Sequence, residues 1–389
     1  MQTIEGGICA VPGVRAAGAR QGKYGVALIA ASGPAAGMFT TNKVRAAPLD
    51  VTAEHLTAFG HLDGVIANSG CANAYTGPRG LEDARRMAGL MAGLLGTDPK
   101  KIAVASTGVI GRYMDMALIA RLFDEARARL RSDPDASAEA AKAVMTTDTR
   151  LKETAVEHQG IRVGGIVKGA GMIEPNVATM LCFLYTDADL TAPVLKECLR
   201  DAVKDSFNML TVDGDMSTND TVLLTATGKV KCRVEDFCEA LRYVCIELAR
   251  KMARDGEGAS KYFETVVTGA KTEQDARLAA KAVANSSLVK TAVYGADPNW
   301  GRIICAVGYS GAAMDPARIT LGLEGEDGLE VSLVKEGRIV DGVLDKAKEI
   351  MSGDTIQIKV DLAMGEAKAR SFGCDLTREY VNINADYTT

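Results

Sequence analysis

The chain has 389 residues, enough for one large or two medium domains with a well-buried core. Hydrophobic residues make up 47% and charged residues 24%, proportions typical of a soluble globular protein. The formal charge of −5 comes without a basic block, which argues against nucleic acid or a membrane surface as partner. Residues 1–12 lack a signal-peptide pattern and no apolar run could span a membrane, so we expect a cytoplasmic protein.

In the first half of the chain, strand-like apolar runs alternate irregularly with amphipathic helices. The expected strands are 24–31, 64–67, 101–106, 161–167 and 179–185. The expected helices are 81–95, 114–131 and 136–145.

The second half begins with more helical character and ends in short β segments. Its expected helices are 192–206, 234–254 and 274–284, and its expected strands are 221–227, 262–267, 288–294, 303–307, 319–323, 329–333 and 356–362. Together the two halves predict an α+β or mixed α/β fold with sheets covered by helices. The late β segments predict a smaller β-rich C-terminal lobe at about 310–389.

Nine cysteines are scattered along the chain without a C-x-x-C pair, and there are three histidines. Cysteines without such a pair indicate reduced thiols. A zinc site is not expected, because only three histidines could join the cysteines as ligands. The second half of the chain contains no histidine, so neither a Ser-His-Asp nor a Cys-His arrangement has an evident base there. An acyl-transfer enzyme with this sequence needs a base of another kind.

Familiar cofactor and metal motifs are missing from the sequence. Gly169-Ala-Gly171 starts like a dinucleotide fingerprint, but Pro175 follows where a helix should open. The segment 213–219 imitates half of a calcium loop, but Thr218 stands where glycine is needed. We therefore expect neither a bound cofactor nor a metal.

The most informative segment is Lys168–Leu181, Lys-Gly-Ala-Gly-Met-Ile-Glu-Pro-Asn-Val-Ala-Thr-Met-Leu, which brings Ala178-Thr179 to the start of an apolar strand. A hydroxyl held at a strained turn can attack its own preceding carbonyl. Cleavage there would leave Thr179 as a new N-terminus, with nucleophile and base on one residue. The same residues also fit a tight turn that enters a buried strand.

Polar, glycine-flanked loops recur at the ends of apolar runs. Any one of them fits a simple turn, but together they indicate loops gathered around a site. They span residues 68–74, 106–111, 145–148, 211–220, 255–258, 297–302 and 384–389.

The Lys168–Leu181 segment and these loops resemble the ornithine acetyltransferase (glutamate N-acetyltransferase) family of arginine biosynthesis, over essentially the whole chain. The resemblance implies an α-β-β-α layered sandwich like that of other enzymes with N-terminal nucleophiles. It also implies self-cleavage between Ala178 and Thr179 into an α chain, 1–178, and a β chain, 179–389. The two chains would remain folded together in an α2β2 assembly.

The family's site residues transfer to matching positions of this sequence. Thr179 matches the nucleophile, and Thr107 and Gly108 match the oxyanion-hole pair. The positions that match substrate contacts are Thr179 itself, Lys168, Glu257, Asn384, Thr389 and one of the pair Thr146 and Thr147.

The implied reaction moves acetyl from N-acetylornithine to glutamate through acetyl-Thr179 by a ping-pong route, without a cofactor. A free α-amine titrates at about pH 7.7–8.0, so Thr179 could serve as its own base. Some relatives also accept acetyl-CoA as a co-substrate, and no residue here decides between the two donors. Lys168 suits a substrate carboxylate and Glu257 an amine, although both also fit exposed loop charges.

One departure from the family pattern is Cys71, which stands where asparagine is expected in the Asn68–Ala74 loop and could alter its hydrogen bonding. The nearest enzymatic alternative is an N-terminal-nucleophile aminopeptidase or amidase of the same fold, in which water takes the acyl group. A metabolite-binding protein without catalysis is the alternative of a different class, and it predicts an uncleaved chain.

Overall fold

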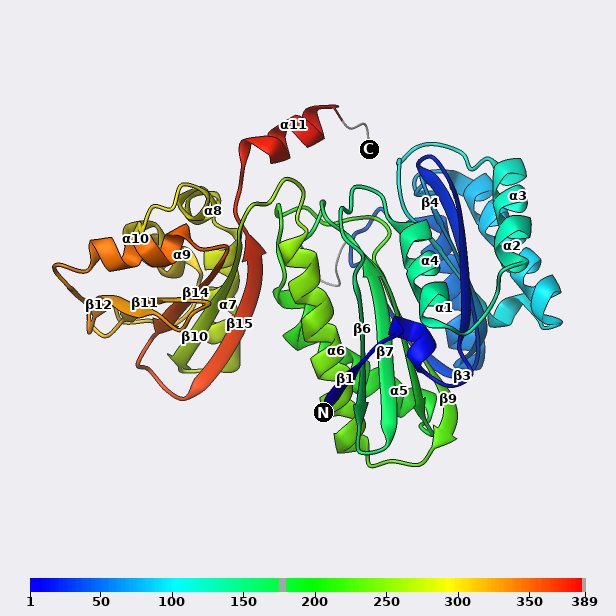
Figure 1. Ribbon diagram of the computed structural model, residues 1–389, viewed down its shortest axis with the longest axis horizontal. Coiled ribbons are helices and arrows are strands. Elements are labelled where there is room, and N and C mark those ends of the chain that lie inside the picture. Colours follow the sequence, from blue (N-terminus) through cyan, green and yellow to red (C-terminus); the bar gives the residue numbers. More distant parts are fainter. Residues whose placement is uncertain (175–179, 387–389) are drawn as a thin grey trace. The chain divides into compact units, whose positions relative to one another are not determined.

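A computed structural model describes residues 1–174 and 180–386, which form two compact units (Figure 1). The first unit comprises residues 1–208 and 215–252 of this described part, and the second comprises 209–214 and 253–386. The second unit thus begins well before the lobe that we expected at about 310–389. It does so because strand β10 (Tyr262–Ala270) pairs with β14 (Thr355–Asp361) and β15 (Ala367–Cys374) in one sheet.

The first unit contains a nine-stranded sheet with the order β1-β6-β7-β8-β9-β3-β4-β5, and β2 also pairs with β3. Its strands are β1 Gln2–Ile4, β2 Arg15–Gln21, β3 Tyr24–Phe39, β4 His61–Ser69, β5 Ile102–Ser106, β6 Glu153–His158, β7 Ile161–Lys168, β8 Leu181–Ala188 and β9 Thr221–Val230. The helices up to residue 254 are η1 Gly7–Ala10, α1 Ala47–Phe59, α2 Gly77–Leu95, η2 Pro99–Lys101, α3 Met116–Arg127, α4 Pro134–Val144, α5 Ala192–Asp205, η3 Phe207–Met209 and α6 Val234–Arg254.

The long strand β3 divides this sheet into two halves. Its first part pairs with β2 and β4, and its last part, from Ala35 to Phe39, pairs with β9. The register with β4 shifts between Ala30 and Gly33, where the strand passes from one half to the other. A single strand therefore joins two sheet halves that pack on each other.

Successive side chains of each strand point to opposite faces of the sheet, which gives each half an inner and an outer face. Ile29 and Val65 belong to the same buried cluster as Phe183 of the other half, together with apolar residues of α4. Their neighbours Leu28 and Ile66 belong to a second cluster, on the opposite face, which is covered by α2 and α3. The first half of the sheet is therefore buried on both faces.

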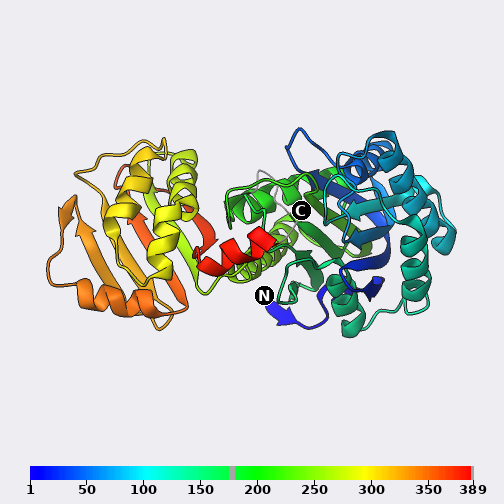
Figure 2. The same cartoon turned by 90° about the horizontal axis from the view of Figure 1, so that it is seen from above.

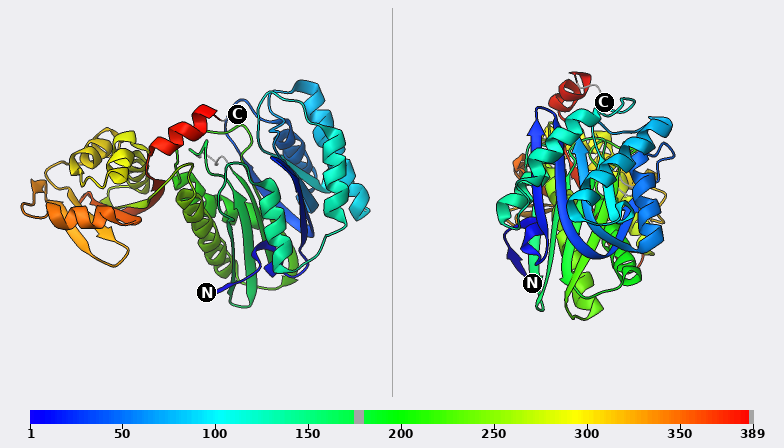
Figure 3. Two further views of the ribbon diagram at one scale, coloured as in Figure 1. Left: turned by 45° about the horizontal axis from the view of Figure 1, so that its top comes forward. Right: turned by 90° about the vertical axis from the view of Figure 1, so that its right-hand side faces the viewer.

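The outer face of the second half is covered by α6. Gly165 of β7 leaves space there, since a Cβ at this position would meet Leu248 at 2.8 Å and Val244 at 3.3 Å. The order of layers is helices, sheet half, sheet half, helices, which can be followed in Figures 1 and 3. The predicted α-β-β-α sandwich of an α+β protein is confirmed.

The second unit contains a six-stranded sheet with the order β13-β12-β11-β14-β10-β15. Helix α7 packs against β10 and β15, and α10 packs against β11 and β12 (Figure 2). Elements of this unit not yet given bounds are α7 Glu273–Asn285, α8 Ser287–Tyr294, α9 Trp300–Tyr309, β11 Thr320–Gly325, β12 Glu330–Lys335, β13 Arg338–Ile339, α10 Leu344–Ser352 and α11 Arg378–Asp386. No helix in the described residues is both long and apolar enough to cross a membrane.

Two strand predictions in the second unit are wrong. The segments 288–294 and 303–307 belong to helices α8 and α9. In α9 the buried residues Ile303, Ala306 and Val307 follow the i, i+3, i+4 spacing of one helix face. Periodicity alone cannot separate a strand from a helix in so short an apolar run, and the β-branched residues favoured a strand.

The prediction of reduced thiols is wrong for one pair. Cys198 of α5 and Cys238 of α6 form a disulfide with a Cα–Cα distance of 5.4 Å. The two residues are 40 positions apart on separate helices, so no local spacing in the sequence announces the pairing. The other seven cysteines are free thiols.

Gly33 allows a test of the close approach of β3 to β9, at the point where β3 passes between the two sheet halves. A Cβ on Gly33 would lie 1.7 Å from the carbonyl oxygen of Ala226 in β9, so Gly33→Ala must force β3 and β9 apart. We expect a loss of about 1–3 kcal/mol or more in the free energy of unfolding, measured by chemical denaturation.

The matched control for this variant is Gly89→Ala, inside α2. No atom lies within 4 Å of the added Cβ there, and alanine favours a helix by about 0.5–1 kcal/mol over glycine. Equal stability of both variants would contradict the close approach of β3 and β9.

Candidate functional site

Five strands of the first unit end or begin around one group of polar residues. Asn68 of β4 pairs with Ser106 of β5, at the carboxyl ends of these parallel strands. Lys168, the last residue of β7, pairs with Leu181, the first residue of β8, which in turn pairs with Thr221 of β9. Side chains from both sheet halves can therefore meet at this edge.

One contact between the two groups of strand ends is made by Lys168. Its side chain is buried, with 5% exposed, and its Nζ donates a hydrogen bond of 3.3 Å to Oγ1 of Thr107. The Thr107 N–H donates to the carbonyl of Asn68 at 3.0 Å. Because the ammonium uses a lone pair of the Thr107 oxygen, the hydroxyl proton can be directed toward another acceptor.

Gly108 follows in a conformation that requires glycine. Its φ is +130°, and a Cβ would lie 2.4 Å from the carbonyl carbon of Gly70. The residues on either side, Thr107 and Val109, both pair with Cys71. Two backbone segments thus lie in direct contact, and a side chain at position 108 would separate them.

Two buried asparagines hold these segments together. Asn219 donates from Nδ2 to the carbonyls of Ala72, at 2.6 Å, and Ser106, at 2.8 Å. Asn68 donates to the carbonyl of Cys71 at 2.9 Å and accepts from the Ser106 hydroxyl at 2.6 Å. Each amide therefore connects the two loops. These hydrogen bonds also satisfy polar groups that are buried.

The Cys71 side chain plays no part in these bridges. Its thiol donates to the carbonyl of Arg112 at 3.3 Å, and burial raises the pKa of this thiol. The bonds between the loops use the backbone of Cys71 and the amide of Asn68 instead. They are therefore compatible with cysteine at this position.

Beneath Lys168 lies a buried ion pair that the sequence did not point to. The side chains of Asp148 and Lys152 are 0% and 1% exposed, and Lys152 Nζ donates to Asp148 Oδ1 at 2.6 Å. The same oxygen accepts from the Gly169 N–H at 2.6 Å, and Oδ2 accepts from the Thr146 N–H at 3.0 Å. One carboxylate therefore connects the loop at 146 to the segment that follows β7.

Charge outweighs burial at Asp148. Burial by itself raises the pKa of this carboxyl, but the charges of Lys168 and Lys152 and the hydrogen bonds from Lys152 and Gly169 hold it below its ordinary value. Asp148 is thus ionised at neutral pH.

In the second unit, Asn384 of α11 donates from Nδ2 to Glu257 Oε2 at 2.8 Å. Glu257 lies in the turn that follows α6, and it is half-buried. These two predicted substrate contacts come together although 127 residues separate them in the chain.

The structure thus places the predicted site residues in two groups, one in each unit. Lys168 bonds to Thr107, which Gly108 follows, and Asp148 connects the Thr146 N–H to the N–H of Gly169, the residue after Lys168. Thr147 is next to Thr146 and is half-buried. Glu257 and Asn384 form the other group, whereas Ala178, Thr179 and Thr389 lie outside the described residues. Sequence reasoning missed Asp148, Lys152 and Asn219, although polar loops containing Asp148 and Asn219 were noted.

A serine, a histidine and an aspartate also meet away from this site, on β3 and β4. Ser32 donates to Asp63 Oδ1 at 2.6 Å, and the same oxygen lies 2.9 Å from His61 Nε2. Ser32 Oγ also lies 3.1 Å from His61 Nε2, so one ring nitrogen faces both the serine and the aspartate, whereas a catalytic triad uses a different ring nitrogen for each. The cluster is not a hydrolytic triad.

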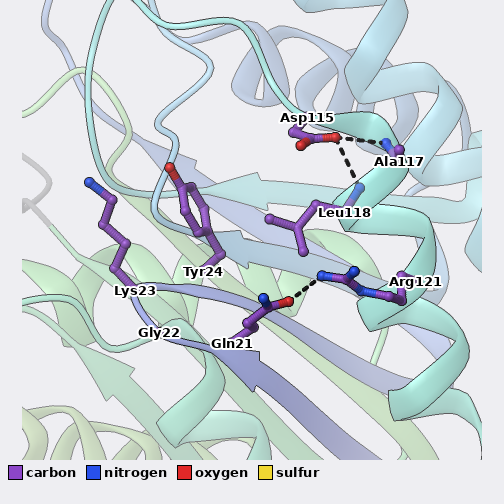
Figure 4. A pocket seen from close by; sticks show the side chains of 8 residues that line it. All are labelled: Gln21, Gly22, Lys23, Tyr24, Asp115, Ala117, Leu118 and Arg121. Atoms are coloured by element: carbon purple, nitrogen blue, oxygen red, sulfur yellow. Dashed lines mark hydrogen bonds between the residues drawn. The ribbon is translucent and has the colours of Figure 1, made fainter.

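An open hollow of about 550 Å³ lies where the turn between β2 and β3 faces α3 (Figure 4). Three of its polar side chains are engaged with one another or with backbone: Asp115 accepts from the N–H groups of Ala117 and Leu118, and Arg121 donates to Gln21. Among residues 1–174 and 180–386, no group of three or more His, Cys, Asp or Glu side chains could hold a metal ion. Neither feature competes with the polar group around Lys168.

Comparison with known proteins gives consistent matches over the whole chain. The model of the ArgJ family matches residues 12–389. A glutamate N-acetyltransferase of Methanosarcina mazei is 54% identical, covering 100% of both chains. The arginine biosynthesis bifunctional protein ArgJ of Archaeoglobus fulgidus is 48% identical over 97% of this chain and 99% of that protein.

Among solved structures, the arginine biosynthesis bifunctional protein ArgJ of Bacillus halodurans is 39% identical. The match has a TM-score of 0.49 and covers 52% of this chain and 96% of that one.

Replacement of Asn219 tests the bridge between the two loops. Asn219→Ala removes the side-chain donor from two carbonyls, and we expect a loss of about 2 kcal/mol or more in the free energy of unfolding. The control is Asn382→Ala, an exposed asparagine that bonds to Glu379 on the surface, expected to change stability by about 0.5 kcal/mol or less. Equal effects in urea denaturation would mean that Asn219 does not hold the loops.

Proposed function

The chain belongs to the ArgJ family, and from this we propose that it is a glutamate N-acetyltransferase that moves acetyl from N-acetylornithine to glutamate. The observation that carries the proposal is the hydrogen bond from Lys168 to Thr107, next to Gly108. It leaves the Thr107 hydroxyl proton available beside a backbone held in a glycine-only conformation. Such a pair suits an oxyanion hole.

The nucleophile in this proposal is Thr179, released by cleavage after Ala178 into chains 1–178 and 179–389. In the sequence, Thr179 precedes β8 by two residues, and Leu181 at the start of β8 pairs with Lys168. Strand β8, which follows the proposed cleavage site in the sequence, therefore starts beside Lys168, and the next residue, Gly169, is hydrogen-bonded to Asp148. The α-amine created by cleavage would supply the base that the missing histidines do not.

The proposed transfer proceeds in two half-reactions. The Thr179 oxygen attacks the acetyl carbonyl of N-acetylornithine while the α-amine takes its proton, and Thr107 O–H and Gly108 N–H receive the developing negative charge. The C–N bond breaks, ornithine leaves with that proton, and acetyl-Thr179 remains. The glutamate amine then attacks this ester, the α-amine transfers a proton from that nitrogen to the Thr179 oxygen, and the C–O bond breaks to give N-acetylglutamate and the free Thr179 hydroxyl.

The remaining site residues are proposed as substrate contacts. Lys168 is suited to a substrate carboxylate as well as to Thr107, because an ammonium has three N–H donors. Glu257, held by Asn384, is suited to a substrate amine. Thr389 and one of Thr146 and Thr147 complete the set.

We also propose which cofactor, partners, assembly and cellular location the enzyme has. It needs no cofactor, because nucleophile, base and oxyanion donors all come from the chain. It would act on small molecules, without nucleic acid or membrane, as an α2β2 assembly of its own two chains. We place it in the cytoplasm, where intermediates of amino-acid biosynthesis are made and consumed.

Self-cleavage is tested by denaturing mass spectrometry of the purified protein. We expect two fragments of about 19 and 22 kDa, the 41.0 kDa total in proportion to 178 and 211 residues, the second beginning with Thr179. Thr179→Ala removes the hydroxyl and should leave the chain intact. Thr179→Ser keeps a hydroxyl and should retain partial cleavage. An intact wild-type chain with full activity, or cleavage of Thr179→Ala at this site, contradicts the proposed nucleophile.

The oxyanion donor is tested by Thr107→Val in an assay of acetylglutamate formation from N-acetylornithine and glutamate. Loss of this donor should lower kcat by about 10²–10³-fold. The matched control, Thr227→Val, removes a hydroxyl that bonds to the carbonyl of Pro12 near the surface and should leave kcat unchanged.

The same assay separates transfer from its alternatives. Release of acetate without acetylglutamate would indicate an amidase, and no reaction of N-acetylornithine at all would contradict the proposal. Acetylglutamate made from acetyl-CoA, with N-acetylornithine absent, would identify a second donor.

A further inference from the structure

Residues 257–261 of the second unit form a link between helix α6 and strand β10, and Glu257 is the first of them. None of these residues lies in a helix or a strand. The position of the Glu257 carboxylate therefore depends on local turns and on hydrogen bonds to other segments, because no regular secondary structure fixes the link.

The buried carboxylate of Asp375 holds one end of this link. Asp375 directly follows β15 and is 3% exposed. Its Oδ1 accepts hydrogen bonds from the N–H groups of Ser260, at 2.9 Å, and Lys261, at 3.1 Å, and its Oδ2 accepts from the Ser260 hydroxyl. Its own N–H donates to the carbonyl of Lys261 at 3.1 Å. One residue thus fixes the link where it enters β10.

The other end of the link is held by the residues that follow Asp375. Thr377 donates from Oγ1 to the carbonyl of Gly258 at 2.7 Å and accepts from the N–H of Tyr380 at 3.3 Å. Gly258 has a φ of +67°, and a Cβ there would lie 2.6 Å from the Tyr380 nitrogen. The first turn of α11 therefore lies directly against the link.

Helix α11 carries Asn384, the partner of Glu257, but buries none of its own residues. Burial of apolar surface therefore contributes little to its position, which depends on hydrogen bonds instead. Asn384 donates to Glu257 Oε2 at 2.8 Å and to the carbonyl of Tyr380 at 3.0 Å. Asp375 begins the short segment, 375–377, that connects β15 to α11 (Figure 1). Its carboxylate thus anchors both the link and the segment that leads to α11.

We propose that Asp375 is a positioning residue that holds Glu257 and Asn384 against each other, so that the Glu257 carboxylate can receive the side-chain amine of the substrate. It acts through the backbone of residues 260–261 on one side and through the start of α11 on the other. Hydrogen bonds of this kind, made behind a binding side chain, keep that side chain in its productive position. The effect on the reaction rests on the proposed function, whereas the anchoring of the link and of α11 does not.

The test compares two acetyl donors that differ only in the side-chain amine, N-acetylornithine and N-acetylnorvaline. Wild type should prefer N-acetylornithine because Glu257 binds its ammonium, and Asp375→Ala should lower this preference in kcat/KM by about tenfold or more. The rate with N-acetylnorvaline should change much less, because that donor makes no use of Glu257. A purely structural defect would lower both rates equally, and that result would overturn the proposal.

Glu257→Gln provides the reference for this effect. It removes the charge that receives the amine and should lower the donor preference by itself. Adding Asp375→Ala should then change the preference by less than about twofold, because both variants disable the same contact. A further loss as large as in the wild-type background would overturn the action of Asp375 through Glu257.

The matched control is Asp361→Ala in the same unit. Asp361 is an exposed aspartate whose carboxylate accepts the N–H of Ala363 at 2.9 Å, after the end of β14. Its replacement should leave the donor preference unchanged. A loss equal to that of Asp375→Ala would mean that any weakened loop of the unit has this effect, and would contradict a specific role of Asp375.

The anchoring is measured without the reaction, by amide hydrogen exchange and mass spectrometry. Asp375→Ala should speed exchange by about tenfold or more, both in residues 255–261 and in α11. Asp375→Asn keeps an oxygen for the two N–H groups, so it should retain most of the protection and most of the donor preference. Unchanged exchange of α11 in Asp375→Ala would overturn the proposal.

A milder variant covers the case in which Asp375→Ala does not fold. Thr377→Val removes the hydroxyl that bonds to Gly258 and to the Tyr380 N–H, and it should loosen α11 and lower the donor preference in the same direction. Thr377→Val with wild-type exchange and wild-type preference would count against the proposal. A wild type that does not react with N-acetylornithine would contradict the proposed function, and hydrogen exchange would then decide on the anchoring by Asp375 alone.

Discussion

The hydrogen bond from Lys168 to Thr107 is the interaction on which the site depends, because it joins the two halves of the first sheet. Lys168 ends β7 in one half, and Thr107 follows β5 in the other. The bond can form only because β3 passes from one half to the other and the halves pack on a shared core. The layered fold thus has a direct chemical consequence at one edge of its sheets.

Buried hydrogen bonds and one close backbone approach fix the loops around this bond. Asn68 and Asn219 bridge the two loops through buried amides, and Gly108 lets the backbones approach where any other residue would clash. Asp148 accepts hydrogen bonds from Lys152, Gly169 and Thr146 and so connects the loop at 146 to the segment that follows β7. In the proposed reaction, these contacts would hold Thr107 and Gly108 as a preorganised donor pair for the developing negative charge.

Much of this could be predicted from the sequence, but not the parts that depend on long-range pairing. Periodicity predicted an α+β or mixed α/β fold with sheets covered by helices, whereas the layered sandwich and the residues around Lys168 followed from the family resemblance. Helices α8 and α9 were missed because short apolar runs carry no decisive period. The Asp148–Lys152 pair and the Cys198–Cys238 disulfide were missed because only the folded chain shows which charges and thiols meet.

The central claim is that Thr179 carries the acetyl group, and one measurement addresses it directly. The purified protein is incubated with N-acetylornithine alone and digested, and the peptide that begins with Thr179 is weighed by mass spectrometry. The account predicts a gain of about 42 Da on that peptide, confined to the threonine hydroxyl and lost when glutamate is added. An unmodified Thr179 in a preparation that still makes acetylglutamate would contradict it.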